Sequence, residues 1–139
     1  MVELYRSDSH PKHIYVIFHN DITLTDIEIV IPYLDTYLVN KSNIIYTVEF
    51  APKSVIRDAR FALESAKFIA RYGESFDSVT VHSLSLVNHT LYKIYCAFTD
   101  RFIKRKYNVD QILLSDRSEW ENSHKISLEK AFKLELTNR

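Results

Sequence analysis

Glycine is nearly absent from this chain, and its scarcity excludes several kinds of site. Gly73 is the only glycine in 139 residues. Rossmann and Walker-A phosphate loops need several glycines, because only glycine lets backbone amides approach a phosphate closely. The Gly-x-Ser-x-Gly elbow of α/β-hydrolases needs two glycines and is excluded for the same reason.

Cysteine, net charge and long apolar runs are also lacking. Cys96 is the only cysteine, so no internal disulfide can form and a reducing compartment is expected. The 18 basic and 18 acidic residues cancel, which removes any global attraction to nucleic acid and limits repulsion between copies of the chain. No apolar run approaches the ~20 residues that cross a bilayer, and residues 1–8 lack the apolar core of a signal peptide. These absences predict a cytoplasmic protein with no transmembrane segment and no nucleic-acid partner.

The composition is that of a globular protein, with 46% hydrophobic, 13% aromatic and 26% charged residues. The chain contains no repeats and no linker rich in proline, glycine or serine. We therefore expect one domain over residues 1–139.

Alternating and apolar segments predict five strands, and apolar residues at helical spacing predict the helices between them. The strands are expected at residues 2–8, 13–18, 44–50, 78–82 and 111–115. The first helix is expected to start at a capping box of Thr25 and Glu28, with Pro32 kinking it or delaying its start. The second helix is expected to open at residues 52–54 and to end at Gly73, and the third to run from about 85 to 107. A further helix is expected to start at a capping box of Ser118 and Glu121, and a final amphipathic stretch covers 128–134.

This order, ββαβαβαβα, predicts an α/β fold with a mixed, mostly parallel five-stranded sheet and right-handed crossovers. Strands 44–50 and 78–82 alternate between apolar and polar residues, whereas strands covered on both faces are apolar throughout. We therefore expect the helices mainly on one face, and the other face partly open or covered by a partner. This pattern argues against a doubly wound, flavodoxin-like domain.

The segment from Phe76 to Asp116 resembles the STAS superfamily, and within it the SpoIIAA-like (STAS/SEC14-type) domains. A strand at 77–82 leads through small residues into a helix with a leucine–tyrosine step at Leu91-Tyr92. A last strand at 112–114 then ends in an acidic turn. The order of elements resembles the family over nearly the whole chain, and the resemblance implies a non-enzymatic binding or regulatory module.

Two departures from the family pattern are visible. His82-Ser83 stands where the family has a glycine after this strand, and the tryptophan often found in the last helix is absent from 127–136, with Trp120 lying earlier. In STAS-type anti-sigma antagonists a phosphorylatable serine lies where the third strand turns into the second helix, which corresponds to Ser54 here. A helix N-terminus tolerates a phosphate well, but the family's Asp-Ser-Ser-Gly signature is missing, and Ser54 also suits a simple helix cap.

Functional groups in parallel sheets gather at the carboxyl ends of the strands. This edge is expected to collect a binding set of Phe50, His82, Ser83, Ser85 and Asp116. His82 with Ser83 or Ser85 suggests a small hydrolase, although a histidine bonded to a neighbouring turn explains the same residues. We assign no catalytic residue.

Other candidate groups have simpler explanations as well. Cys96 and His89 lie seven positions apart on one predicted helix, where a nucleophilic pair or a buried thiol would fit. The histidines form no metal-binding motif, although His10 and His13 could bind a metal adventitiously. We expect no metal and no cofactor.

Two further features leave alternatives open. A basic cluster lies at the end of the third predicted helix and consists of Arg101, Lys104, Arg105 and Lys106. It could bind a phosphate or a lipid headgroup, or it could simply be a solvated helix end, where cations are favoured. A surplus of aromatic residues could enclose an apolar ligand or fill the core. The sequence thus suggests a module that binds another protein or a second copy of itself, with a carrier or sensor of a small apolar or lipidic ligand and a small hydrolase as alternatives.

Overall fold

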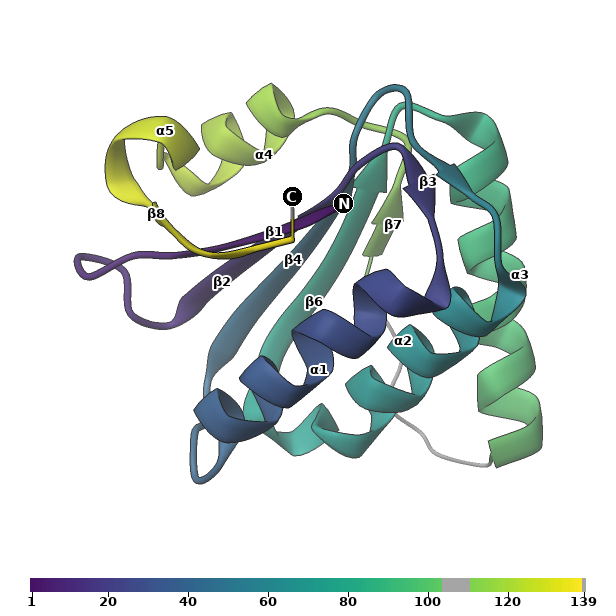
Figure 1. Cartoon of the computed structure of the whole chain (residues 1–139). Coiled ribbons are helices and arrows are strands. Elements are labelled where there is room, and N and C mark those ends of the chain that lie inside the picture. Colours follow the sequence, from purple (N-terminus) through teal and green to yellow (C-terminus); the bar gives the residue numbers. More distant parts are fainter. Residues whose placement is uncertain (104–110, 139) are drawn as a thin grey trace.

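A computed structural model describes residues 1–103 and 111–138 of the chain. They form an α/β domain in which one mixed sheet lies between a layer of three longer helices and a smaller layer of two short helices (Figure 1). The strands are β1 (Val2–Arg6), β2 (His13–Phe18), β3 (Asp21–Ile22), β4 (Ile44–Phe50), β5 (Val55–Ile56), β6 (Phe76–Ser83), β7 (Gln111–Leu113) and β8 (Lys133–Thr137). The helices are α1 (Leu24–Leu38), α2 (Ala59–Arg71), the 3-10 turn η1 (Gly73–Ser75), α3 (Leu86–Ile103), α4 (Arg117–His124) and α5 (Leu128–Ala131).

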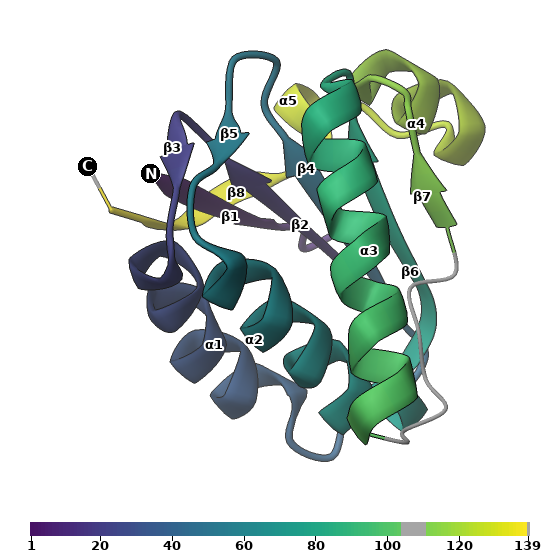
Figure 2. The same ribbon diagram turned by 90° about the vertical axis from the view of Figure 1, so that its right-hand side faces the viewer.

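The main sheet has six strands in the order β7-β6-β4-β2-β1-β8. Strands β2, β4, β6 and β7 are parallel, whereas β1 and β8 are antiparallel to their neighbours. Each crossover helix leads to the adjacent strand, and α1, α2 and α3 lie side by side on one face of the sheet (Figure 2). The α/β class and the five predicted strands are confirmed, but the predicted five-stranded sheet is wrong by one strand, because β8 from the C-terminal segment adds to the edge beside β1.

The larger core lies between this helix layer and the sheet. Phe18, Phe50 and Phe61 are at most 1% exposed, and their rings lie 4.8 to 6.2 Å apart between centroids. Burying such side chains stabilises the fold by about 1.5–3 kcal/mol each. This core therefore fixes the helices relative to the strands that carry the site.

The opposite face of the sheet is covered by the chain itself, which corrects the prediction of a face partly open or covered by a partner. Trp120 in α4 and Phe132 after α5 pack with Tyr15 and Ile17 of β2 in a second buried cluster. The indole Nε1 of Trp120 also donates a 3.0 Å hydrogen bond to Thr47 of β4. The alternation in β4 therefore marks buried polar contacts with α4.

The starts of α1 and α4 differ from the predictions, because other residues nearby in the sequence form the caps. Helix α1 begins at Leu24, where the Asp26 carboxylate accepts from the backbone N–H of Thr23, so the predicted Thr25–Glu28 box is wrong. Pro32 lies inside α1, which continues to Leu38. Helix α4 begins after Asp116, whose carboxylate accepts from the backbone N–H of Glu119, so the predicted Ser118–Glu121 box is wrong too.

Residues 52–58 form no helix, contrary to the prediction that the second helix opens at 52–54. Strand β5 instead pairs in parallel with β3, and the side chain of Asp58 caps α2 at Ala59. The predicted amphipathic stretch at 128–134 divides into the short helix α5 and the edge strand β8. Among the described residues, no helix is long and apolar enough to cross a membrane.

Candidate functional site

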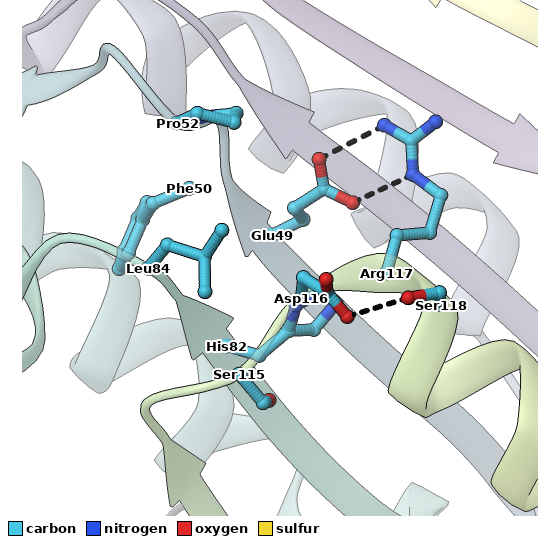
Figure 3. A pocket seen from close by; sticks show the side chains of 9 residues that line it. All are labelled: Glu49, Phe50, Pro52, His82, Leu84, Ser115, Asp116, Arg117 and Ser118. Carbon is cyan, nitrogen blue, oxygen red and sulfur yellow. Dashed lines mark hydrogen bonds and ion pairs between the residues drawn. The ribbon is translucent and has the colours of Figure 1, made fainter.

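A pocket of about 260 Å³ opens at the carboxyl ends of β4 and β6, beside the start of α4 (Figure 3). Its apolar wall consists of Phe50, Pro52 and Leu84, which lie on one side, and an ion pair lies on the other. The complete lining is Glu49, Phe50, Pro52, His82, Leu84, Ser115, Asp116, Arg117 and Ser118. The pocket thus lies at the strand edge where the sequence predicts a binding site.

The polar side of the pocket is built around Glu49. Arg117 donates to both carboxylate oxygens, from Nε at 2.8 Å and from Nη2 at 2.9 Å. The Glu49 side chain is only 7% exposed, whereas that of Arg117 is 41% exposed. A two-pronged contact of this kind is short and directional, so it ties the first residue of α4 to the end of β4.

Tyr15 and His82 extend this network beneath the pocket. The Tyr15 hydroxyl donates to Glu49 Oε1 at 2.6 Å and lies 2.7 Å from His82 Nε2. Because an ionised carboxylate only accepts hydrogen bonds, the phenol proton points at Glu49 and the phenol oxygen accepts from His82 Nε2. The tautomer of His82 is assigned from this network, and it leaves Nδ1 without its proton. That atom is buried and forms no hydrogen bond of ordinary geometry.

The charges of the network follow from its contacts. Burial raises the pKa of Glu49, but the hydrogen bonds from Arg117 and Tyr15 outweigh it and hold that pKa below its usual value. Burial lowers the pKa of His82, and the opposing effects of Glu49 and the Ser115 backbone do not restore it. At neutral pH the network therefore contains an ionised Glu49, a charged Arg117 and a neutral His82.

A second pocket of about 190 Å³ lies between β6 and α4. It shares His82 and Ser115 with the first pocket, so the two pockets are neighbours. Its remaining lining residues are Thr80, Glu119, Trp120, Ser123 and His124.

Three of the five residues predicted for the binding edge line the first pocket, namely Phe50, His82 and Asp116. Ser83 and Ser85 are not among its lining residues. The Ser83 hydroxyl accepts from the backbone N–H of Ser85 at 3.0 Å, and His82 bonds to Tyr15 instead of either serine. The described contacts thus give the hydrolase hypothesis no paired nucleophile and base.

Ser54 lies in the turn between β4 and β5, so its predicted place at a helix N-terminus is wrong. The residue is 2% exposed, and its hydroxyl donates to the carbonyl oxygen of Ala51 at 2.7 Å. Asn88 of α3 donates to the same hydroxyl at 3.2 Å and to the Ser54 carbonyl oxygen at 2.8 Å. Ser54 therefore joins the turn to α3, and phosphorylation of Ser54 stays a prediction.

Several predicted groups fall outside the described residues. The side chains of Cys96 and Arg101 lie outside them, and so do all atoms of residues 104–107, which include the rest of the basic cluster. In the part of the chain that the structure describes, no three His, Cys, Asp or Glu side chains are arranged so that they could hold a metal ion.

Exposed apolar side chains gather next to the first pocket. Seven large hydrophobic residues are described as exposed, and four of them lie within an eleven-residue segment at the end of β6 and on α3. We call these four the α3 patch: Leu84, Leu86, Val87 and Ile94, between 53% and 65% exposed. Leu114, 52% exposed, directly follows β7, the neighbour of β6 in the sheet.

Sequence reasoning missed Glu49, Arg117 and Tyr15, although one signal was present. Glu49 is the one charged residue in β4, and a carboxylate at such a position needs a partner when the strand is buried. The partner lies 68 residues away along the chain, so no local pattern could reveal it.

Comparison with protein-family models, curated proteins and solved structures finds no match to this chain.

Proposed function

We propose that this protein is a non-enzymatic, STAS-like binding or regulatory module, and that the α3 patch is its contact surface for a protein partner. The observation that carries the proposal is the concentration of exposed apolar side chains on α3 and in the turn that leads into it. Scattered exposed hydrophobic residues are ordinary, whereas a contiguous group marks an interaction site. Burial against a partner would remove this apolar surface from water.

The polar groups near the patch support binding more than catalysis. Glu49 is already paired with Arg117, and His82 Nε2 with Tyr15. A general base must reach the proton that it abstracts, but the other nitrogen of His82 is buried. The network therefore serves to hold α4 and the pocket wall in place beside the patch.

The arrangement of the sheet supports the STAS-like part of the proposal. Four parallel strands follow one another in sequence order, with α1, α2 and α3 on a single face. This agrees with the element order on which the resemblance rests. The arrangement of the sheet does not identify the partner, which the experiment below is designed to find.

A second function, the carrying or sensing of a small apolar ligand, is favoured by the wall of Phe50, Pro52 and Leu84 in the first pocket. At about 260 Å³ the pocket would hold only a small molecule. Mass spectrometry of the native protein would test it, since a bound ligand adds a mass that denaturation removes. A native mass equal to that of the bare chain would contradict this function.

The test of the main proposal compares two pairs of surface substitutions. Leu86→Asp with Val87→Asp places charges on the α3 patch, while Val39→Asp with Leu134→Asp alters exposed hydrophobic residues elsewhere. Sedimentation equilibrium would measure self-association, and quantitative affinity purification from the native host would measure other partners. We expect the patch variant to weaken the association at least tenfold and the control variant to leave it unchanged. A monomer that binds no partner, or equal effects of the two variants, would contradict the proposal.

A further inference from the structure

Three histidines meet where α4 and α5 cover the sheet. His13 opens β2, His10 lies in the turn before it, and His124 ends α4. The ring centroid of His13 lies 5.8 Å from that of His10 and 5.8 Å from that of His124. The indole of Trp120 stacks on His124 at 4.7 Å. The contact between α4 and β2 therefore includes rings that gain charge when acid is added.

His13 is the member least able to carry a charge. Its Nδ1 is buried and forms no hydrogen bond within the described part of the chain. Trp120 and Phe132 meet its ring at 6.3 and 6.4 Å between centroids, so two aromatic side chains also enclose it. Burial, together with His124 and His10, lowers the pKa of His13 to about 4.

The charged groups on the neighbouring elements do not compensate a charge on His13. The Asp8 carboxylate in the preceding turn is paired with Lys133 at the start of β8. The Glu121 carboxylate of α4 accepts from the backbone N–H of Leu128 at 2.7 Å. The titratable side chains that act on His13 are thus His10 from the turn and His124 from α4, and neither supplies a negative charge that would stabilise a proton on His13.

We propose that His10, His13 and His124 form a pH-sensitive latch that holds the α4–α5 segment on the sheet when neutral and releases it on acidification. A proton on His13 favours the open form, because burial and the neighbouring rings of His124 and His10 disfavour the charge in the closed form. Arg117 stays paired with Glu49 at the other end of α4, so the segment opens from its far end. Opening uncovers the apolar side chains of Tyr15 and Ile17 on β2.

Hydrogen exchange measured by mass spectrometry at pH 7.5 and pH 5.0 tests this latch on the whole chain. The reporters are the amides of Ile126, Ala131 and Phe132, which are bonded within the α4–α5 segment. With a pKa of about 4 for His13 in the closed form and about 6.5 in the open form, their protection should fall about thirtyfold at pH 5.0. The amides of β4 and β6 should keep their protection from exchange.

His13→Phe preserves the ring packing without the charge, and the fall in protection should shrink to a few-fold or less. His124→Phe provides a second variant in case His13→Phe folds poorly, and it should also reduce the fall. His19→Gln, which changes a histidine paired with Glu3 outside the cluster, should behave like the wild type. Three results would each overturn the proposal. The reporter amides could keep their protection at pH 5.0, or lose it equally in the wild type and both phenylalanine variants, or the amides of β4 and β6 could lose protection in parallel.

Discussion

Replacing Arg117 with methionine should destabilise the fold and reverse part of its pH dependence. The substitution keeps an apolar stem of similar length but removes both donors to Glu49. Glu49 is then left as a buried carboxylate with only the Tyr15 hydroxyl to hold its charge. The perturbation therefore acts mainly through the desolvated carboxylate.

The size of the effect follows from the burial of the two partners. Removing one partner of a fully buried pair costs about 3–5 kcal/mol. Arg117 is 41% exposed here, so water screens part of the interaction, and we expect about 2–3 kcal/mol at pH 7. Glu49→Gln should cost less, about 1–2 kcal/mol, because the freed arginine can turn into water. The double variant should cost about 1–2 kcal/mol less than the sum of the two single variants, since the pair is already broken.

The pH dependence has a definite sign. In the wild type the pKa of Glu49 is lowered, so its contribution is present above the unfolded glutamate pKa of about 4.3 and is lost as the pH falls through the lower folded pKa. In the methionine variant burial dominates, and the pKa of Glu49 should lie above the unfolded value. Its penalty is then present at neutral pH and disappears as the carboxylate is protonated. The difference between wild type and variant should shrink in acid.

Urea denaturation at several pH values from 7.5 to 4.5 would measure this difference. A loss below about 0.5 kcal/mol at pH 7, or a loss that does not change with pH, would refute the idea that Glu49 is a buried charge held by Arg117. Additive single and double variants would refute the pairing itself.

Three further substitutions test other contacts. Tyr15→Phe removes the hydroxyl between Glu49 and His82; it should cost about 1–3 kcal/mol in urea denaturation, and an unchanged midpoint would contradict the network. Asn88→Ala removes three hydrogen bonds that join α3 to Ser54 and Ile56. The free energy of unfolding should fall by about 2–4 kcal/mol, and the α3 amides should lose protection in hydrogen exchange. Unchanged exchange of these amides would show that the three bonds do not hold α3. Ser54→Glu puts a charge at a buried hydroxyl and should lower the melting temperature by several degrees; a glutamate variant as stable as wild type would instead favour Ser54 as a phosphorylation site that the fold tolerates.

The parts of the fold predicted from sequence are those with a strong local signal. The β-branched and aromatic run at 13–18 and the alternation at 44–50 identify β2 and β4 with their observed bounds. Helix starts were predicted less well, because Thr25 and Glu28 have the spacing of a capping box as clearly as the Thr23–Asp26 pair that forms. Local spacing alone does not choose between overlapping boxes.

Features that depend on distant contacts were not predictable from local patterns. Strand β5 exists because Ile56 pairs beside Ile22, 34 positions earlier along the chain. Strand β8 alternates in sequence at Leu134, Glu135 and Leu136, but Leu134 also continues the helical spacing of the residues before it, and only pairing with the distant β1 makes this segment a strand. The covered face of the sheet likewise follows from Trp120 reaching Thr47.

The edge of the sheet was predicted as the place of the site, but its chemistry was not. Topology alone brings Phe50, His82 and Asp116 to one pocket, as the rule for parallel strands expects. The ion pair of Glu49 and Arg117 depends on where α4 returns over the sheet. This return is set by the second buried cluster, whose members are far apart along the chain.

The most direct test of the binding proposal is site-specific photo-cross-linking in the native host. A photoreactive residue such as p-benzoylphenylalanine would replace Val87 in the α3 patch, with the same residue at Val39, on the end of α1, as the control; the two side chains are 60% and 58% exposed. The proposal predicts a covalent adduct from position 87, identified by mass spectrometry as one partner protein or a second copy of this chain, and none from position 39. No adduct at position 87, or the same adducts from both positions, would contradict it.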